Sequence, residues 1–368
     1  MPKTEQLKTA REKLQDCRRR RLLLGASSAL AVSALPGSAW AQQSALVAGG
    51  AAVAAPGVVT LSVPGPGGSV SMPLELAIKI GADKAEGLLL RLTFVNGGGV
   101  AIADLLSGNA QFGVFGLPAA MNSNLKAPRL VALAAVDDLP LYTLMVRADL
   151  RGKIRRIADL KGRVLGVHSD TLATKTTAHQ LADLVLRSQG VEPADVSYLA
   201  AGQSWQTQSS AFRSGAVDAS MCDEPFGTRL VAEGLAFELF STGNPADAAK
   251  VAGAGFLRAA LISRRDLIEA DAALAARMVR VVQRSLAWIA THTPEAAADL
   301  LAYAGAERKA FLDVLRKYPR QYSRDAMFSR AQLAQTTLFF RAQDPDNPAA
   351  QRYAIDTMIV DKWSGSKT

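Results

Sequence analysis

The chain has 368 residues, a formal net charge of +9 and 49% hydrophobic residues. This length supplies an ordinary hydrophobic core and predicts two domains rather than one. The basic residues form no stripe interleaved with aromatic side chains, so the composition argues against nucleic-acid binding.

The first 41 residues have the layout of a secretory signal. Residues 18–21 are four arginines, residues 22–35 are apolar or small, and Ala39-Trp40-Ala41 forms a small-x-small cleavage site. The apolar run is short for a membrane span, and no stop-transfer segment follows it. We therefore predict a signal peptide over 1–41 and a periplasmic protein. Residues 19–23 fit the twin-arginine pattern, so export by the Sec route and by the twin-arginine route both stay open.

Loss of the leader changes the charge and the cysteine count. The leader carries eight basic and three acidic residues, so the mature chain has a net charge of +4, which suits an anionic solute. Cys17 leaves with it, and Cys222 alone cannot form an intramolecular disulfide. No histidine is near Cys222 in the sequence, so we interpret it as a small buried hydrophobe rather than a nucleophile.

The elements then alternate along the chain. Residues 42–57 are rich in alanine and glycine and predict a flexible linker. Strands are predicted at 58–64, 88–95, 111–115, 130–136, 142–147, 164–168, 196–199, 217–221, 237–241 and 256–262, with helices between most of them. This alternation predicts an α/β fold of mainly parallel sheets flanked by helices. The last hundred residues instead predict helices at 271–291, 294–303, 307–316 and 329–342.

Six turns that follow predicted strands share one chemistry. They are rich in glycine, serine, threonine or asparagine, and nearly all of them open a helix. The six turns are residues 65–73, 96–99, 115–118, 168–174, 201–205 and 222–226. Helix capping alone explains any one of them. In open α/β sheets, however, ligands bind beyond the carboxyl ends of strands, and helix N-termini attract anions. The six turns together therefore predict a ligand cleft.

The order of several segments resembles a known family. GLPAAM (116–121) follows LLSGNAQFGV (105–114), and IADLKGRVLGV (157–167) and AFRSGAVDASMCDEPF (211–226) come next. This order resembles the nitrate/sulfonate/taurine type of ABC-transporter substrate-binding proteins and is also similar to the relatives that bind thiamine-pyrimidine precursors. The resemblance implies a two-lobed periplasmic binding protein type II fold, with two crossover strands near 142–146 and 237–242 as the hinge. Lobe 1 would be 58–144 and 244–368, and lobe 2 would be 145–243.

The resemblance also implies which residues bind the solute. In lobe 1 these are Ser69, Ser71, Asn96, Gly98, Gly116 and Leu117, and in lobe 2 they are His168, Ser169, Asp170, Thr171, Thr174, Gln203, Ser204, Asp223 and Glu224. The three carboxylates are unexpected beside an anion, so they must point outward, pair with a base or accept from a ligand amine or hydroxyl. For Asp170 we favour the role of helix N-cap over ligand contact.

The implied function is that of an exported solute-binding subunit of an ABC importer. It would capture a small organic anion, such as a sulfonate, taurine or an aromatic carboxylate, and deliver it as a monomer to a membrane permease and its ATPase. Three scattered histidines and one cysteine have no metal spacing, so we expect no metal, no cofactor and no catalysis. Two alternatives remain: a sensory ligand-binding ectodomain partner, and a pyrimidine-related enzyme on the same fold, although the cysteine-rich iron motif of such enzymes is absent here.

Overall fold

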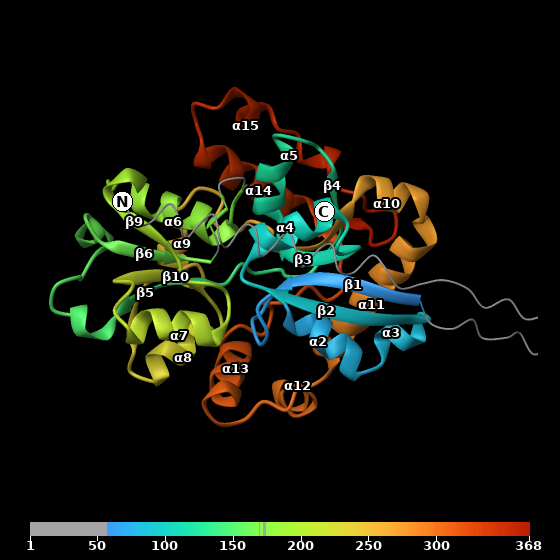
Figure 1. Cartoon of the computed structure of the whole chain (residues 1–368), viewed down its shortest axis with the longest axis horizontal. Helices are drawn as coiled ribbons and strands as arrows, with labels where there is room; N and C mark the ends of the chain where they lie inside the picture. Colours follow the sequence, from blue (N-terminus) through green and yellow to red (C-terminus); the bar gives the residue numbers. More distant parts are fainter. Residues whose placement is uncertain (1–56, 169, 172–173) are drawn as a thin grey trace, which may run out of the picture. The chain divides into compact units, whose positions relative to one another are not determined.

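The computed structural model describes residues 57–168, 170–171 and 174–368 (Figure 1). The predicted signal peptide and all of the predicted linker except Gly57 lie outside these ranges, as does Ser169. Among the described residues, no helix is both long enough and apolar enough to cross a membrane.

The first sheet has five strands in the order β2-β1-β3-β12-β4. Its strands are β1 (Gly57–Pro64), β2 (Leu88–Val95), β3 (Phe112–Gly116), β4 (Leu130–Ala135) and β12 (Ala259–Arg264). β1 pairs in parallel with β2 along its whole length and also with β3. β12 is antiparallel to both of its neighbours, β3 and β4.

The second sheet also has five strands, in the order β11-β5-β10-β6-β9. Its strands are β5 (Tyr142–Arg147), β6 (Val164–Val167), β9 (Ser197–Ala200), β10 (Ala219–Asp223) and β11 (Ala236–Ser241). β6 is parallel to β9 and β10, whereas β5 is antiparallel to β10 and β11. The predicted crossover strands are therefore both members of the second sheet, and the chain passes between the sheets before β5 and after β11.

The two sheets have the same plan. In each of them four strands run in one direction, and one reversed strand lies between the third strand and an edge strand. The reversed strand is the first one that the chain enters after leaving the other sheet. The predicted α/β fold with mainly parallel sheets is confirmed, and the one reversed strand in each sheet is the detail that the alternating pattern did not indicate.

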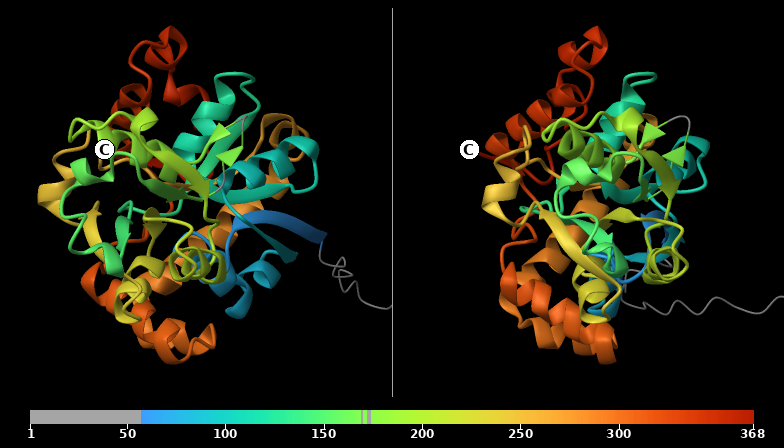
Figure 2. Two further views of the ribbon diagram at one scale, coloured as in Figure 1. Left: turned by 60° about the vertical axis from the view of Figure 1, so that its left-hand side comes forward. Right: turned by 90° about the vertical axis from the view of Figure 1, so that its left-hand side faces the viewer.

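Helices cover the sheets on both faces, and their bounds are α2 (Met72–Lys79), α3 (Ala82–Ala85), α4 (Gly98–Ser107), α5 (Leu117–Asn124), α6 (Thr177–Arg187), α7 (Trp205–Arg213), α8 (Phe226–Ala232), α9 (Pro245–Ala248), α10 (Arg265–Ala270), α11 (Ala272–Thr291), α12 (Pro294–Leu300), α13 (Gly305–Lys317), α14 (Arg330–Gln343) and α15 (Pro348–Arg352). Figure 2 shows α12 and α13, in orange, at the opposite end of the described part from α14 and α15, in red. There are also two short strand pairs: β7 (Asp170–Thr171) with β8 (Thr174–Lys175), and β13 (Phe328–Ser329) with β14 (Ser366–Lys367).

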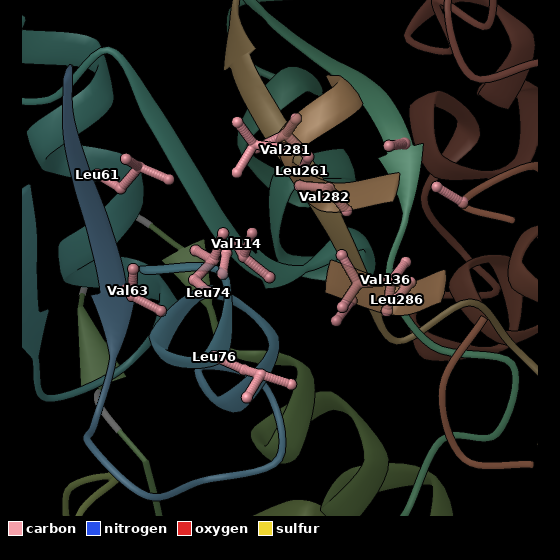
Figure 3. Packing of buried hydrophobic residues seen from close by; sticks show 14 of the residues in the cluster. Leu61, Val63, Leu74, Leu76, Val114, Val136, Leu261, Val281, Val282 and Leu286 are labelled. Atoms are coloured by element: carbon pink, nitrogen blue, oxygen red, sulfur yellow. The ribbon is translucent and has the colours of Figure 1, made fainter. Parts of the chain in front are cut away.

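The core of the first sheet explains why α11 forms where the sequence predicts a helix. Its apolar residues recur at helical spacing, and Asp271 caps its start by accepting a hydrogen bond from the Leu274 N–H at 2.8 Å. The buried face includes Val281 and Val282, which pack with Leu61 of β1 and Leu74 of α2 in one cluster (Figure 3). This packing holds β1 and α2 in place, and the turn between them, residues 65–71, reaches the candidate site.

Candidate functional site

The starts of the two reversed strands lie among the ends of parallel strands. In the first sheet, Ala259 at the start of β12 pairs with Gly116 at the end of β3. In the second sheet, Tyr142 at the start of β5 pairs with Asp223 at the end of β10. Arg258, directly before β12, and Tyr142 therefore lie at the edges where the predicted ligand turns emerge.

Arg258 is the largest fully buried side chain of the described residues. Residues next to the first sheet accept hydrogen bonds from its guanidinium. Its Nε donates to Asp137 Oδ2 at 2.6 Å, and its Nη1 donates to Ser69 Oγ at 2.9 Å and to the Leu141 carbonyl at 3.3 Å. The other Asp137 oxygen accepts from the Ala259 N–H at 3.0 Å. Burial disfavours the charge of Arg258, but Asp137 and Asp223 outweigh that effect, and the pKa of Arg258 is raised above its ordinary value.

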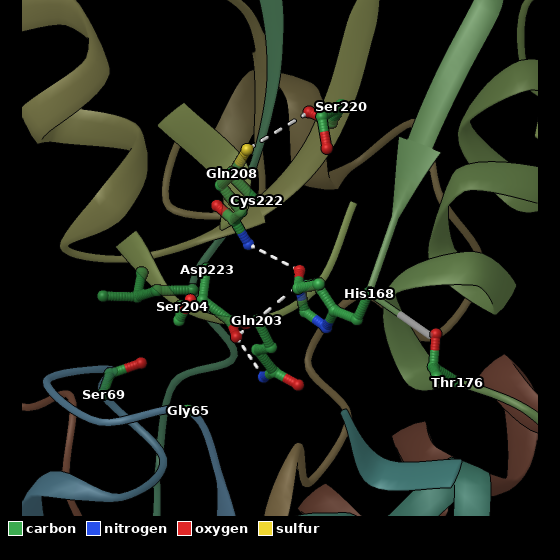
Figure 4. Close-up of polar contacts among 12 residues, drawn as sticks. Gly65, Ser69, His168, Thr176, Gln203, Ser204, Gln208, Ser220, Cys222 and Asp223 are labelled. Atoms are coloured by element: carbon green, nitrogen blue, oxygen red, sulfur yellow. Dashed lines mark hydrogen bonds and ion pairs between the residues drawn. The ribbon is translucent and has the colours of Figure 1, made fainter. Parts of the chain in front are cut away.

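Asp223 faces the same guanidinium from the second sheet. Its Oδ1 lies 3.6 Å from Arg258 Nη1, and its Oδ2 lies 3.6 Å from His168 Nε2. Gln203 Nε2 donates to the same Oδ2 (Figure 4). We call these residues the Arg258 cluster: Ser69, Asp137, His168, Gln203, Asp223 and Arg258. All of its side chains are buried.

Several polar atoms of the Arg258 cluster have unused hydrogen-bonding capacity. Arg258 Nη2, Asp223 Oδ1 and His168 Nε2 are buried and make no hydrogen bond to any described residue. A buried polar atom without a partner costs free energy and calls for a ligand, a water molecule or an ion as its partner. Burial also lowers the pKa of His168, so its imidazole is neutral at neutral pH.

Glu224 connects the two sheets through its backbone. Its carbonyl accepts a hydrogen bond from the Ser69 N–H at 3.1 Å, and Tyr322 holds the other side of Ser69 by donating to its carbonyl at 2.9 Å. The Glu224 carboxylate is buried and accepts from the Thr228 N–H at 3.0 Å. Burial raises the pKa of Glu224 to about 7, so this carboxyl is half-protonated near neutral pH.

The turn after β6 differs from the prediction. The helix was expected to follow residues 169–171 directly, with Asp170 as its cap. Instead, Asp170 and Thr171 form β7, whose backbone pairs antiparallel with β8, with Asp170 opposite Lys175 in the register. The helix α6 begins at Thr177, and Thr176 caps it by accepting from the His179 N–H at 3.3 Å. The capping prediction for Asp170 was wrong, because a hairpin stands between the strand and the helix.

Lys175 ties this hairpin to the helix. Its Nζ donates to Asp183 Oδ2 at 2.7 Å, and Asp183 Oδ1 accepts from the Tyr198 hydroxyl at 2.5 Å. Predicted binding by Thr171 and Thr174, which belong to this hairpin, stays a prediction, and Ser169 lies outside the described residues.

Other predicted residues use their polar groups locally. Ser71 Oγ donates to the Gly65 carbonyl at 2.8 Å, and Ser204 caps α7 by accepting from the Thr207 N–H at 3.2 Å. Asn96 is exposed, and Gly98 opens α4. Binding by these four residues also stays a prediction.

The end of β3 makes a close approach to the second sheet's helix α6. The Leu117 N–H donates to the Arg258 carbonyl at 2.7 Å, so this turn is joined to the Arg258 cluster. A Cβ atom added at Gly116 would lie 2.0 Å from Thr177 Oγ1, which is buried and makes no hydrogen bond to a described residue. Only glycine allows the two elements to meet at this distance.

Of the predicted site residues, Ser69, His168, Gln203 and Asp223 are brought together in the Arg258 cluster, and Gly116, Leu117 and Glu224 border it. Sequence reasoning missed Arg258, Asp137 and Tyr142. A signal for Arg258 was present, since it is the only charged residue in the apolar run VAGAGFLRAALI over 251–262. A lone charge in a buried strand needs a partner, and this alone marks it for attention.

The surroundings of Cys222 agree with its interpretation as a small buried hydrophobe. Cys222 is buried, and its Sγ donates to the Ser220 carbonyl at 3.6 Å. Burial raises the pKa of this thiol, which keeps it in the unreactive form. The described part of the chain contains no group of three or more histidine, cysteine, aspartate or glutamate side chains that could hold a metal ion.

A family model described as "NMT1/THI5 like" matches residues 71–297, which is more than half of the chain. The chain belongs to this NMT1/THI5-like family. The match agrees with the resemblance to ABC-transporter substrate-binding proteins and contains all of the Arg258 cluster except Ser69, which lies two residues before it. No curated protein matches the chain.

Solved structures share the fold of this family member. A protein from Bordetella bronchiseptica RB50 superposes with a TM-score of 0.75 at 20% identity, over 83% of this chain and 95% of that one. The alkanesulfonate-binding protein SsuA from Xanthomonas axonopodis pv. citri, bound to MOPS, gives 0.64 at 17% identity, over 84% and 99%. The desulfurization enzyme DSZB gives 0.55 at 21% identity, over 83% and 97%. The fold thus carries both solute binding and catalysis.

Proposed function

We propose that this protein is the exported solute-binding component of an ABC importer. It takes a small organic solute with an acidic group at the Arg258 cluster and delivers it, as a monomer, to a permease and its ATPase in the inner membrane. The observation that carries the proposal is Arg258 Nη2, a charged hydrogen-bond donor that is fully buried and has no partner among the described residues. An acidic oxygen of the solute would supply the missing acceptor.

The placement of the Arg258 cluster supports a closing cleft. The cluster draws Ser69, Asp137 and Arg258 from the first sheet and His168, Gln203 and Asp223 from the second. The predicted lobes, 58–144 with 244–368 and 145–243, would therefore meet at it, with the hydrogen bond from Ser69 to the Glu224 carbonyl as a direct link. Closure of two lobes around a solute removes its acidic group from water, which strengthens each charged contact.

The similarity to an alkanesulfonate-binding protein and the predicted signal peptide support the same function. The enzyme DSZB has the same fold, so the fold alone does not decide between binding and catalysis. We favour binding because Cys222, the one cysteine outside the predicted leader, is buried with a raised pKa and lies outside the Arg258 cluster. A sensory role would use the same cleft and differ in the membrane partner.

The proposal is tested on the mature protein purified without denaturation. Mass spectrometry of the small molecules released on unfolding should find an organic acid, and adding it back should raise the melting temperature. Arg258→Lys keeps the charge but loses the fork of donors, so it should weaken binding about tenfold or more. Arg264→Lys, at the far end of the same strand, is the matched control and should bind normally.

Two results would contradict the proposal. One is a native protein that releases no small molecule and shows no thermal shift with sulfonates or carboxylates at millimolar concentration. The other is turnover of the bound solute by the purified protein, which would favour an enzyme.

A further inference from the structure

The Arg258 cluster contains more negative than positive charge. Asp137 and Asp223 bring two carboxylates, and Arg258 brings one guanidinium. His168 does not restore the balance, because burial keeps it neutral at neutral pH, and Gln203 and Ser69 are uncharged. A solute that brings only an acidic group would add a third negative charge around a single positive one, in a region that is shielded from water.

The carboxylates of Asp137 and Asp223 differ in how many of their oxygens accept a hydrogen bond. Asp137 uses both oxygens, because Oδ2 accepts from Arg258 Nε at 2.6 Å and Oδ1 accepts from the Ala259 N–H at 3.0 Å. Asp223 accepts a hydrogen bond only at Oδ2, from Gln203, and its Oδ1 is 3.6 Å from Arg258 Nη1 without a hydrogen bond to any described residue. Asp223 Oδ1 is therefore the carboxylate oxygen of the Arg258 cluster that can still accept a hydrogen bond.

An unpaired acceptor and an unpaired donor thus lie close together. Asp223 Oδ1 faces the Nη1 side of the guanidinium whose Nη2 has no acceptor. A molecule that approaches Arg258 Nη2 with an acid would come within a few ångström of Asp223. The two open positions are complementary to a solute that carries an acid and an N–H donor a short distance apart.

We infer that the solute is zwitterionic, with a basic amino group that donates to Asp223 Oδ1 beside an acidic group that accepts from Arg258 Nη2. This inference rests on the proposed function and narrows it from organic acids in general to amino acids in the chemical sense, including aminosulfonates. Asp223 is then a specificity-determining residue. Its carboxylate attracts a solute that has an amino group and repels an acid of the same shape that lacks one.

The test compares acids that differ only by the amine, as probes for thermal shift and calorimetry. The pairs are taurine with ethanesulfonate, 3-aminopropanesulfonate with propanesulfonate, and 3-aminopropanoate with propanoate. In each pair that binds, the amino member should bind about tenfold or more tightly, as expected for a charge-assisted hydrogen bond in a buried site. Ethylamine, the cation without the acid, should bind more weakly than taurine.

The variant Asp223→Asn sharpens the comparison. It keeps the shape and the bond to Gln203 but removes the charge, so the preference for the amino member should fall at least tenfold, and the plain acids should bind more tightly than to the unaltered protein. Asp195→Asn, which removes a partly exposed carboxylate paired with Lys161, is the matched control and should leave the preference unchanged.

The outcomes separate this inference from the proposed function. Plain acids that bind as tightly as their amino partners would overturn the inference and leave the proposed function intact. If no member of any pair binds and no organic acid is released from the native protein, the proposed function fails, and the inference fails with it. An unchanged preference in Asp223→Asn would assign the discrimination to another residue and overturn the inference.

Discussion

The reversed strands β12 and β5 occupy the same place in their sheets, yet their starts carry different chemistry. β12 is preceded by Arg258, which donates three hydrogen bonds and forms an ion pair with Asp223, whereas β5 begins with Tyr142. The Tyr142 ring lies 5.5 Å from the Arg258 guanidinium carbon and 6.1 Å from the His168 ring. The shared topology sets where a side chain reaches the site, and the residue type at that place decides whether it supplies charge or an aromatic wall.

The largest effect expected from this comparison is that of Arg258→Met. The variant leaves Asp137 and Asp223 buried without their cation, so the free energy of unfolding should fall by about 3–5 kcal/mol, measured by urea denaturation. Adding Asp137→Asn should recover part of this loss, since it removes one of the stranded charges. Arg264→Met, which breaks a pair with the exposed Asp266, should cost about 1 kcal/mol or less. Equal losses in the two arginine variants would break the comparison.

The next effect concerns Glu224, a buried carboxyl that has no ion pair within the described residues. Its pKa is raised by burial to about 7 from an ordinary value of 4.5, so the folded state holds this proton more tightly than the unfolded state. Its contribution to stability is fully present below about pH 4.5 and is lost as the pH rises through 7. The loss amounts to about 3 kcal/mol.

Glu224→Gln removes this titration and keeps an acceptor for the Thr228 N–H. Urea denaturation between pH 5 and pH 8 should show that the variant gains stability relative to the unaltered protein as the pH rises. A constant difference between the two proteins over this range would show that Glu224 keeps its ordinary pKa.

A smaller effect is expected where β3 meets α6. Gly116→Ala places a methyl group against Thr177, so it should lower the free energy of unfolding by about 1–3 kcal/mol or hold the two elements apart. Thr177→Gly in the same chain should relieve the clash. Gly152→Ala, whose Cβ would meet no atom within 4 Å, serves as the control, and a loss in that variant equal to the loss in Gly116→Ala would argue against this close approach.

The smallest effect is expected at the start of the other reversed strand. Tyr142→Phe keeps the ring and should change the free energy of unfolding by about 0.5 kcal/mol or less. Tyr142→Leu also removes the contact between the ring and the Arg258 guanidinium. Calorimetry should then show that the solute binds more weakly by about 1 kcal/mol. A Phe variant as unstable as Arg258→Met would show that the two starts are energetically alike.

Much of the fold could be predicted because periodicity is a local property. Strand β5 and helix α11 begin and end within one residue of their predicted bounds. The direction of a strand within its sheet depends on long-range pairing, so the pattern did not show that β12 is reversed. Arg258 was missed for this reason: in a parallel strand, the residue before the start would lie at the edge opposite the ligand turns. The β7–β8 hairpin was missed because strands of two residues are too short for any periodicity.

The position of the reversed strands also has a consequence for folding order. All five strands of the second sheet lie within one stretch, residues 142–241, whereas the first sheet lacks an inner strand until residues 259–264 arrive from beyond that stretch. The second sheet can pair as soon as its own residues are available, but in the first sheet β4 pairs only with β12 and must wait for it, while β3 already pairs with β1. The half of the molecule that the chain begins first is therefore the half that it completes last, and Arg258 enters the site together with the strand that closes the first sheet.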